Sequence, residues 1–246
     1  MLTSPRAMTT PLRPPVLDPR QVPVIATDQA LPAVPAQHLT ADWLRQRFAR
    51  AGDFVPEIPG DGGLLGSRSP AAAAVLVPLV QRPQGLQVLL TQRTAHLRDH
   101  AGQISFPGGR SEPEDATPRH TALREAQEEI GLPPDQVEVI GELPLYRTVT
   151  AFEVTPVVAL LRPELQLRLD AFEVAEAFEV PLAFLMDPAH HRRHLFRWEG
   201  GERQFLSMPW TGSGLAEPGL SVTPREYFIW GATAAMLRNF YRFLQV

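Results

Sequence analysis

Residues 108–132 of this chain read GGRSEPEDATPRHTALREAQEEIGL, and the last third of that stretch carries the strongest signal for the fold. Glu125, Glu128 and Glu129 are spaced three and four residues apart, so a helix places their carboxylates on one surface. Like charges this close repel by on the order of 1 kcal/mol per pair in water, and by several times more near a protein surface. A divalent cation removes that penalty, and carboxylate ligands suit Mg²⁺ or Mn²⁺ rather than zinc. The stretch therefore predicts a helix that binds a hard divalent cation.

An ordinary exposed helix face is the alternative for the same acids. Arg119 and Arg124 would then neutralise them in surface ion pairs, since runs of charge are usually solvated. Gly108 and Gly109, just before the helix, let the backbone approach a metal or a phosphate closely, although a tight turn at a strand end would also require them. The segment before the helix favours the metal site over the exposed face.

The composition excludes several classes of function. The net charge of −4 gives no basic footprint for nucleic acid, and the absence of Cys excludes disulfides, thiolate nucleophiles and Cys-based zinc sites. All 23 basic residues are Arg, so any cationic contact to a phosphate comes from a guanidinium group. No apolar run approaches 18 residues and no signal peptide is recognisable. We expect a soluble, cytoplasmic protein that binds neither a membrane nor nucleic acid.

The chain divides into a proline-rich tail and one domain. Residues 1–38 contain eight prolines and little apolar periodicity, which predicts an extended or disordered tail that contributes little to a core. The domain is expected to span 39–246 and to open with a helix after Thr40, a candidate N-cap before ADWLRQRFARAG. The oligomeric state is open, with a homodimer as one option.

The rest of the chain mixes strands and helices irregularly. Strands are predicted at 71–80, 86–93, 137–143, 152–161 and, more briefly, 165–169; a helix at about 118–131; a strand or turn leading into a helix at 174–187; a hairpin at 194–198 and 203–208; and a helix within 227–244. This order argues for an α/β (α+β) sandwich rather than a barrel or a doubly wound sheet.

The stretch from Arg124 to Leu132, REAQEEIGL, resembles the signature of the Nudix hydrolase superfamily, R-E-U-x-E-E-x-G-U, where U is a bulky apolar residue. Ala126 is smaller than the usual residue at its place. The upstream half also departs, because Asp115 stands where Glu is usual and the spacer that follows it is one residue longer. The departure puts a metal-ligand role for Asp115 in doubt.

A second motif lies immediately upstream. LLTQRTAHLRDHAGQISFPGG, residues 89–109, resembles the additional signature of the coenzyme A pyrophosphatase branch of that superfamily, with Thr94 as a mild departure. The positions in register are Leu89, Leu90, Thr91, Arg93, Arg98, Gly102, Phe106, Pro107, Gly108 and Gly109. The same branch tolerates the longer acidic spacer. The resemblance implies a Nudix-type α/β/α sandwich with a mixed β-sheet.

The resemblance also implies roles for individual residues. Glu125 and Glu129 correspond to metal ligands, and Glu128 to either a third ligand or the base that deprotonates the attacking water. The carbonyl group of Gly109 corresponds to a further ligand.

For three arginines, the sequence leaves two roles open: a function at the site or a simple ion pair. Arg124 is expected to orient Glu128 four residues on, with a surface ion pair as the alternative. Arg93 and Arg98 are candidates for the substrate's phosphates, including the 3′-phosphate of coenzyme A, or for salt bridges beside the core.

Two further groups have ordinary interpretations. Phe106 is expected in the core rather than stacked on a base. His190, His191 and His194 lie among arginines without nearby acids or Cys, which indicates a solvated loop.

These features predict a Mg²⁺- or Mn²⁺-dependent pyrophosphatase acting on a small molecule. The resemblance gives coenzyme A or an acyl derivative as the substrate, split into 3′,5′-ADP and 4′-phosphopantetheine. A Nudix enzyme for another nucleoside diphosphate derivative, such as ADP-ribose or NADH, is the alternative enzyme. A non-catalytic module that binds a nucleotide metabolite is the alternative outside enzymes, and the three clustered acids argue against it.

Overall fold

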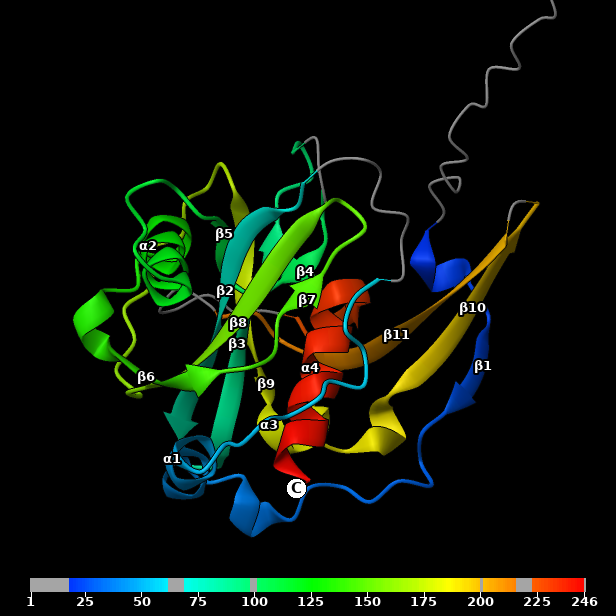
Figure 1. Cartoon of the computed structure of the whole chain (residues 1–246), viewed down its shortest axis with the longest axis horizontal. Coiled ribbons are helices and arrows are strands. Elements are labelled where there is room, and N and C mark those ends of the chain that lie inside the picture. Colours follow the sequence, from blue (N-terminus) through cyan, green and yellow to red (C-terminus); the bar gives the residue numbers. More distant parts are fainter. Residues whose placement is uncertain (1–17, 62–68, 98–100, 200, 216–222, 246) are drawn as a thin grey trace, which may run out of the picture.

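The computed structural model describes residues 18–61, 69–97, 101–199, 201–215 and 223–245. They form two β-sheets with helices packed on and between them (Figure 1). The larger sheet contains β2 (Ala71–Arg82), β3 (Gly85–Arg93), β4 (Ile104–Ser105), β5 (Gly108–Arg110), β6 (Val137–Glu142), β7 (Tyr146–Arg147), β8 (Phe152–Leu161) and β9 (Val174–Pro181). The smaller sheet contains β1 (Val24–Thr27), β10 (Arg192–Trp198), β11 (Gly201–Gly212) and β12 (Arg225–Trp230). The α-helices are α1 (Ala41–Ala49), α2 (Pro118–Ile130), α3 (Leu182–Leu185) and α4 (Gly231–Leu244), beside four short 3₁₀ turns, Pro19–Gln21, Ala36–His38, Pro134–Gln136 and Pro188–His190.

The larger sheet is mixed, as the sequence predicts. β2 and β8 run parallel in its centre, and the other described pairings are antiparallel, in the order β4-β3-β2-β8-β6 with β5, β7 and β9 attached at the sides. Apolar runs such as AVLVPLV in β2 are buried on both faces, which is typical of a central strand covered on both sides.

Helices cover both faces of this sheet. On one face, Ala122, Ala126 and Ile130 of α2 are fully buried in a cluster with residues of β2, β3 and β8. On the other face, α4 packs in a larger cluster that also takes in α1 and the smaller sheet, and Figure 1 shows α4 in red between the two sheets. The predicted α/β/α sandwich is confirmed. Among the described residues, no helix is both long and apolar enough to cross a membrane.

Local signals set the ends of α2, the helix with the clustered acids. Thr117 caps the first turn, its Oγ1 accepting a hydrogen bond from the backbone N–H of His120 at 3.2 Å, and Pro118 occupies the first helical position. Gly131 ends the helix with φ of +66°, a left-handed conformation that favours glycine. Helix α1 likewise follows the predicted cap, Thr40.

The segment at 165–169, predicted as a short strand, is irregular and pairs with no strand among the described residues. The backbone of residues 168–170 instead pairs with the end of α2: the N–H of Arg168 donates to the carbonyl of Ile130 and that of Asp170 to the carbonyl of Glu129, both at 2.9 Å. A helix C-terminus presents unpaired carbonyl groups, and this segment satisfies two of them. In the C-terminal region, the predicted helix starts at Gly231, because 225–230 form β12.

Residues 18–38 pack on the domain, in contrast to the extended or disordered tail that their prolines predict. Strand β1 pairs with β10 at the edge of the smaller sheet, and Val22 and Val34 are buried. Asp28 accepts a hydrogen bond from Arg193 at 2.7 Å and forms an ion pair with Arg238 at 3.0 Å. The domain therefore includes at least residues 18–38. The expected tail survives as a prediction only for 1–17, which lie outside the described residues.

Candidate functional site

The two sequence motifs meet where β5 lies against α2. Pairing of β5 with β2 brings Gly108 and Gly109 beside the acids of the helix. The N–H of Gly108 donates to Oε2 of Glu129 at 3.2 Å. Gly109 is closer still to Glu125: a Cβ added to it would lie 2.6 Å from the carboxylate carbon. With Glu125 in its present place, this backbone leaves no room for a side chain at position 109.

Glu129 is the most deeply placed acid of the helix. It is 4% exposed, and Oε1 lies 3.3 Å from Nη1 of Arg93, its guanidinium partner on β3. Burial raises the pKa of Glu129 to about 7, and the opposing effects of the Gly108 N–H and Arg93 do not cancel it. The nearby charges of Glu125 and Glu173 raise this pKa further. Burial disfavours the ionised form of this carboxylate, and a bound cation would stabilise that form.

Glu125 faces the same region one turn earlier. Burial raises its pKa, and the charges of Glu128 and Glu173 add to the shift against the attraction of Arg124. Glu173 is a residue that the sequence analysis missed: it also lies 3.7 Å from Nη2 of Arg93. It follows Glu129 by 44 residues, and no local spacing in the sequence links the two.

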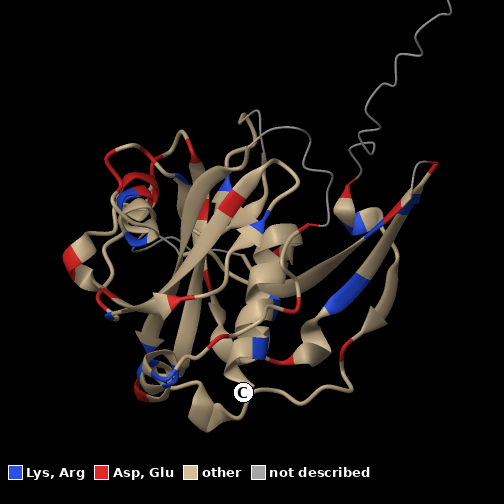
Figure 2. Ribbon diagram, in the orientation of Figure 1, with Lys and Arg blue, Asp and Glu red and all other residues tan. Residues whose placement is uncertain are grey.

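Arg124 ties the acidic groups to the preceding loop. Its guanidinium contacts Asp115 and Glu128 at 2.9 Å and Glu125 at 3.0 Å, and Nη2 donates to the carbonyl of Arg110 at 3.0 Å. The contact between Arg124 and Glu128, predicted from their i,i+4 spacing, is present; red and blue lie together on α2 in Figure 2. The Glu128 side chain remains 59% exposed, so it can still reach a ligand or a water.

Asp115 is fully engaged within the loop. Arg124 and the backbone N–H of Glu112 donate to its carboxylate and lower its pKa to about 2. This anion neutralises the arginine that lies beside Glu125 and Glu128. The geometry gives Asp115 a structural role in holding Arg124.

The donor set fits a hard divalent cation bound through two carboxylates. Gly109 lies against the carboxylate of Glu125, and Gly108 donates a hydrogen bond to that of Glu129. Burial raises the pKa of both carboxylates, which favours their protonated forms. Within the described part of the chain, no three His, Asp or Glu side chains converge into a ready-made metal cluster. Mg²⁺ seldom requires one, since it commonly binds through one or two carboxylates and keeps waters or substrate phosphates as its other ligands.

The remaining predicted residues are distributed as follows. Arg93 lies at this site, 23% exposed and shared between Glu129 and Glu173. Arg98 lies outside the described residues. Phe106 is 2% exposed in the core, as expected.

The solvated loop predicted for the histidines is wrong for two of the three. His191, just before β10, and His194, within it, are 0% and 2% exposed. His191 Nε2 lies 2.8 Å from the carbonyl of Leu185, and His194 Nδ1 lies 2.8 Å from that of Val22. Burial lowers the pKa of His191 to about 4. Both rings are structural groups, remote in sequence from the acidic helix.

Comparison with known proteins gives consistent similarities. A family model described as NUDIX domain matches residues 70–198. The uncharacterized Nudix hydrolase NudL of Escherichia coli (strain K12) is 45% identical over 169 residues, which cover 68% of this chain and 79% of that protein. The NudL protein of Shigella boydii serotype 18 shows the same identity over the same shares.

Two solved structures show more distant similarity. A Caenorhabditis elegans Ap4A hydrolase in a binary complex is 21% identical, with a TM-score of 0.40 over 48% of this chain and 85% of that one. A MutT/nudix family protein of Enterococcus faecalis is 17% identical, with a TM-score of 0.41 over 84% of this chain and 75% of that one.

Proposed function

This chain belongs to the Nudix hydrolase family, whose members generally use a divalent metal, and we propose that it hydrolyses the pyrophosphate bond of coenzyme A or an acyl derivative in a Mg²⁺- or Mn²⁺-dependent reaction. Its activity as a pyrophosphohydrolase on a nucleoside diphosphate derivative follows from the family. The choice of coenzyme A depends on the motif at 89–109.

One contact carries the proposal. Arg93 belongs to the upstream motif and Glu129 to the acidic helix, 36 residues later, yet their side chains lie 3.3 Å apart. The same upstream motif ends in the two glycines that approach Glu125 and Glu129. The residues that resemble the coenzyme A branch are therefore part of the acidic site, which supports their use in selecting the substrate.

The proposed roles follow from the environment of each side chain. Glu125 and Glu129, with the carbonyl group of Gly109, would hold the cation, which neutralises charge on the pyrophosphate oxygens and activates a water when bound. Glu128 is the most exposed of the three acids and lies at the solvent side, where it can act as a further ligand or accept the proton of the attacking water. Arg124 orients Glu128.

Arg93 is the proposed contact to the pyrophosphate, because its guanidinium lies beside the acids that would hold the cation. Its present pairing with Glu129 and Glu173 positions it for that task. Arg98 remains a candidate for a contact to the substrate's phosphates, on the basis of the sequence alone. The cytoplasmic location and the oligomeric state also stay predictions.

Product analysis tests the substrate. The full chain is incubated separately with coenzyme A, an acyl-coenzyme A, NADH and ADP-ribose, each with Mg²⁺ and with Mn²⁺, and the products are separated by chromatography. We expect 3′,5′-ADP and 4′-phosphopantetheine from coenzyme A at a kcat/KM at least about tenfold above that for the other nucleotides, a difference of about 1.4 kcal/mol in transition-state binding. Preferred cleavage of ADP-ribose or NADH would assign the enzyme to the other substrates. Binding without cleavage of any of them would favour the non-catalytic alternative.

A further inference from the structure

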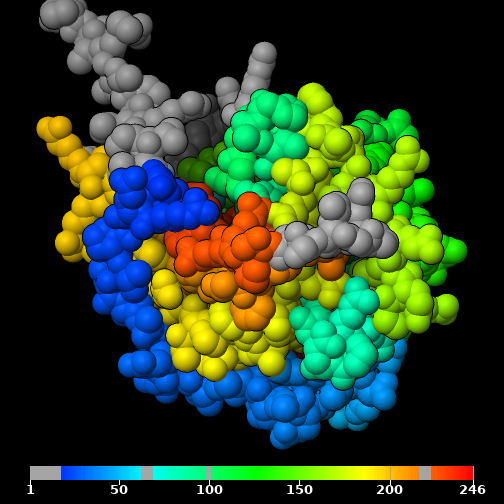
Figure 3. Space-filling view, turned by 180° about the vertical axis from the view of Figure 1, so that it is seen from behind, coloured from blue at the N-terminus to red at the C-terminus, as the bar shows by residue number. Residues whose placement is uncertain are grey.

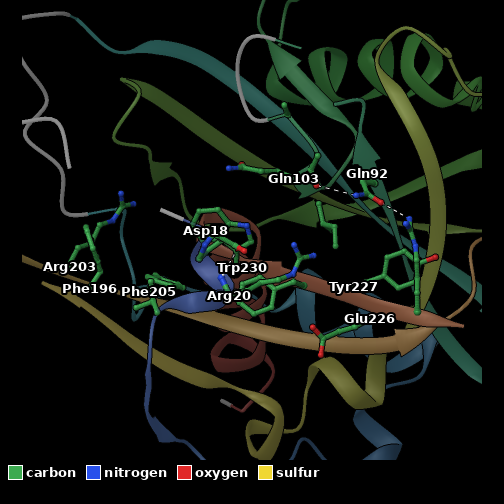
Figure 4. Close-up of a pocket in the computed structure, with 17 residues that line it drawn as sticks. Asp18, Arg20, Gln92, Gln103, Phe196, Arg203, Phe205, Glu226, Tyr227 and Trp230 are labelled. Atoms are coloured by element: carbon green, nitrogen blue, oxygen red, sulfur yellow. Dashed lines mark hydrogen bonds between the residues drawn. The ribbon is translucent and has the colours of Figure 1, made fainter. Parts of the chain in front are cut away.

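A pocket of about 500 Å³ opens beside the smaller sheet. Its walls come from four separate parts of the chain: the segment from Asp18 to Val22, Gln92 of β3, residues 101–104 ahead of and within β4, and the strands β10 to β12. Figure 4 shows these side chains around the pocket, and Figure 3 shows the blue N-terminal segment beside the orange of β12 at the surface. Its volume is in the range of pockets that hold small ligands.

A second hollow adjoins this pocket and reaches Arg93. It is lined by Gln92, Gly102 and Arg225, which also line the first pocket, and by Arg93, which pairs with Glu129. The two hollows therefore share walls, and Arg93 relates the second of them to Glu129 of the acidic helix. A substrate cleaved at the acids can place one of its halves in the pocket.

The lining is rich in aromatic rings. Phe196, Phe205 and Trp230 come from β10, β11 and β12 and are only partly buried, and the rings of Phe205 and Trp230 meet edge to face with centroids 5.5 Å apart. Planar aromatic walls favour a planar heterocycle, because stacking of a base on such a ring is worth about 1–3 kcal/mol. The flexible pantetheine arm of coenzyme A has no ring that could stack in the same way.

One cation of the lining is available to a ligand. Arg203 pairs with Asp61 at 3.1 Å, and Arg225 pairs with Glu176 and donates to Gln92. Arg20 is exposed, and among the described residues no carboxylate forms an ion pair with its guanidinium, which lies 5.5 Å from the ring centre of Phe228. A guanidinium in this setting suits a phosphate group.

We propose that this pocket binds the adenosine 3′-phosphate half of the substrate, with the purine among the aromatic rings and the 3′-phosphate on Arg20. The inference rests on the proposed function, since it assumes a substrate made of an adenosine bisphosphate and a second arm. It gives residues 18–22, which precede the family match at 70–198, a part in substrate selection.

Calorimetric titration of the full chain with the two product halves tests the pocket without relying on turnover. The probes are 3′,5′-ADP, AMP and 4′-phosphopantetheine. Arg20→Ala is expected to weaken the binding of 3′,5′-ADP by roughly tenfold or more, the loss typical of a charge-assisted contact, and the binding of AMP by much less. Phe205→Leu, which keeps an apolar side chain beside His194, is expected to weaken both adenine nucleotides. Binding of 4′-phosphopantetheine should be unchanged in both variants.

Arg197→Ala is the matched control, because Arg197 lies on β10 with a side chain 73% exposed and pairs only with Glu202 among the described contacts. Equal affinity for 3′,5′-ADP in the unmutated protein and Arg20→Ala would overturn the phosphate contact, and unchanged affinity for both adenine nucleotides in Phe205→Leu would overturn the base site. Weaker binding of 4′-phosphopantetheine in these variants would assign the pocket to the other half. If the protein hydrolyses coenzyme A but the variants bind 3′,5′-ADP normally, the proposed adenosine site is wrong and the proposed activity is supported. If it binds 3′,5′-ADP through Arg20 without cleaving coenzyme A, the function fails and the pocket stands.

Discussion

The backbone of Gly109 lies so close to the carboxylate of Glu125 that a single added methyl group would displace it: the built Cβ comes within 2.6 Å of the carboxylate carbon and of Oε1. The carboxylate is the end of a flexible side chain and can move away without disturbing the backbone. The choice of residue at position 109 therefore decides where the carboxylate of Glu125 lies.

Gly109→Ala should lower kcat by about a hundredfold while leaving the fold intact, because displacement of a reacting group by about 1 Å has effects of this size. The measurement combines steady-state kinetics with thermal unfolding, and Tm is expected to stay within about 3 °C of the unmutated value. Retention of normal turnover would show that Glu125 need not occupy its present position.

Gly108→Ala is the contrasting variant. A Cβ there would lie 2.6 Å from Cα of Val75 and would also meet the carbonyl oxygen of Ala74, so it strikes the backbone of β2. We expect a fall in Tm of roughly 5 °C or more, since each kcal/mol lost shifts Tm by about 2–4 °C in a chain of this size. A loss of turnover alone, without a loss of stability, would contradict this assignment.

Glu125→Gln and Glu129→Gln should each reduce turnover by at least about a hundredfold, because an amide cannot supply the negative charge that holds the cation. Circular dichroism should show an unchanged fold. Glu202→Gln, an exposed acid on β11 that pairs with Arg197, serves as the matched control. Near-normal activity of either helix variant at saturating Mg²⁺ would remove it from the metal site.

Removal of divalent cations should abolish activity, and Mg²⁺ or Mn²⁺ should restore it. A readout independent of turnover is thermal stability: a cation that binds only the folded state stabilises it by about 1.4 kcal/mol at ten times its Kd. We expect Tm to rise with Mg²⁺ in the unmutated protein and to stay level in a variant carrying both Glu125→Gln and Glu129→Gln. An equal rise in both would place the cation elsewhere.

Local signals in the sequence predicted the acidic helix and most strands. The end of α2 depends on Gly131, a residue whose conformational freedom can be recognised from its place after the periodic segment. The i,i+4 contact of Arg124 with Glu128 follows from helix geometry alone. The meeting of the two motifs was also predictable, because only residues 110–117 separate the glycine pair from the helix.

Contacts between distant segments could not be read from local patterns. Glu173 joins Arg93 across 80 residues, and its approach depends on the path of 165–169 around the end of α2. His194 is buried, and the carbonyl of Val22, 172 residues earlier, accepts its hydrogen bond. Prolines disfavour regular local structure, but they give no information on whether a neighbouring edge strand will pair with the segment.

Deletion of residues 2–38 should lower the free energy of unfolding by at least about 4 kcal/mol, or roughly 8 °C in Tm. The estimate combines the burial of Val22 and Val34, each worth about 1.5–3 kcal/mol, with the loss of Asp28 from the buried Arg238. Deletion of 2–17 is the control, because it leaves every described contact of the segment in place. Equal stability of the longer deletion and the unmutated protein would mean that the packing of 18–38 contributes nothing.

Glu57 gives a pH-dependent test of the contacts around α4. Burial opposes its ionisation, but hydrogen bonds from Arg238, Arg242 and Arg193 outweigh that effect and lower its pKa from 4.5 to about 2. Arg238 is 0% exposed, and its Nε lies 2.8 Å from Oε2 of Glu57. Removal of this charge leaves a buried guanidinium with fewer partners, which typically costs several kcal/mol.

Glu57→Gln should therefore lower the free energy of unfolding by at least about 2 kcal/mol at pH 7, as measured by urea denaturation. Because the folded-state pKa of Glu57 lies below its unfolded value, the stabilisation is complete above about pH 4.5 and is lost as the pH falls toward 2. The difference between the unmutated protein and the variant should stay constant from pH 7 to 5 and narrow between pH 4.5 and 2. Glu153→Gln, which removes an acid paired with the exposed Arg147, should change stability by less than about 1 kcal/mol. A difference that widens on acidification would mean that the carboxylate is strained rather than stabilised by its arginines.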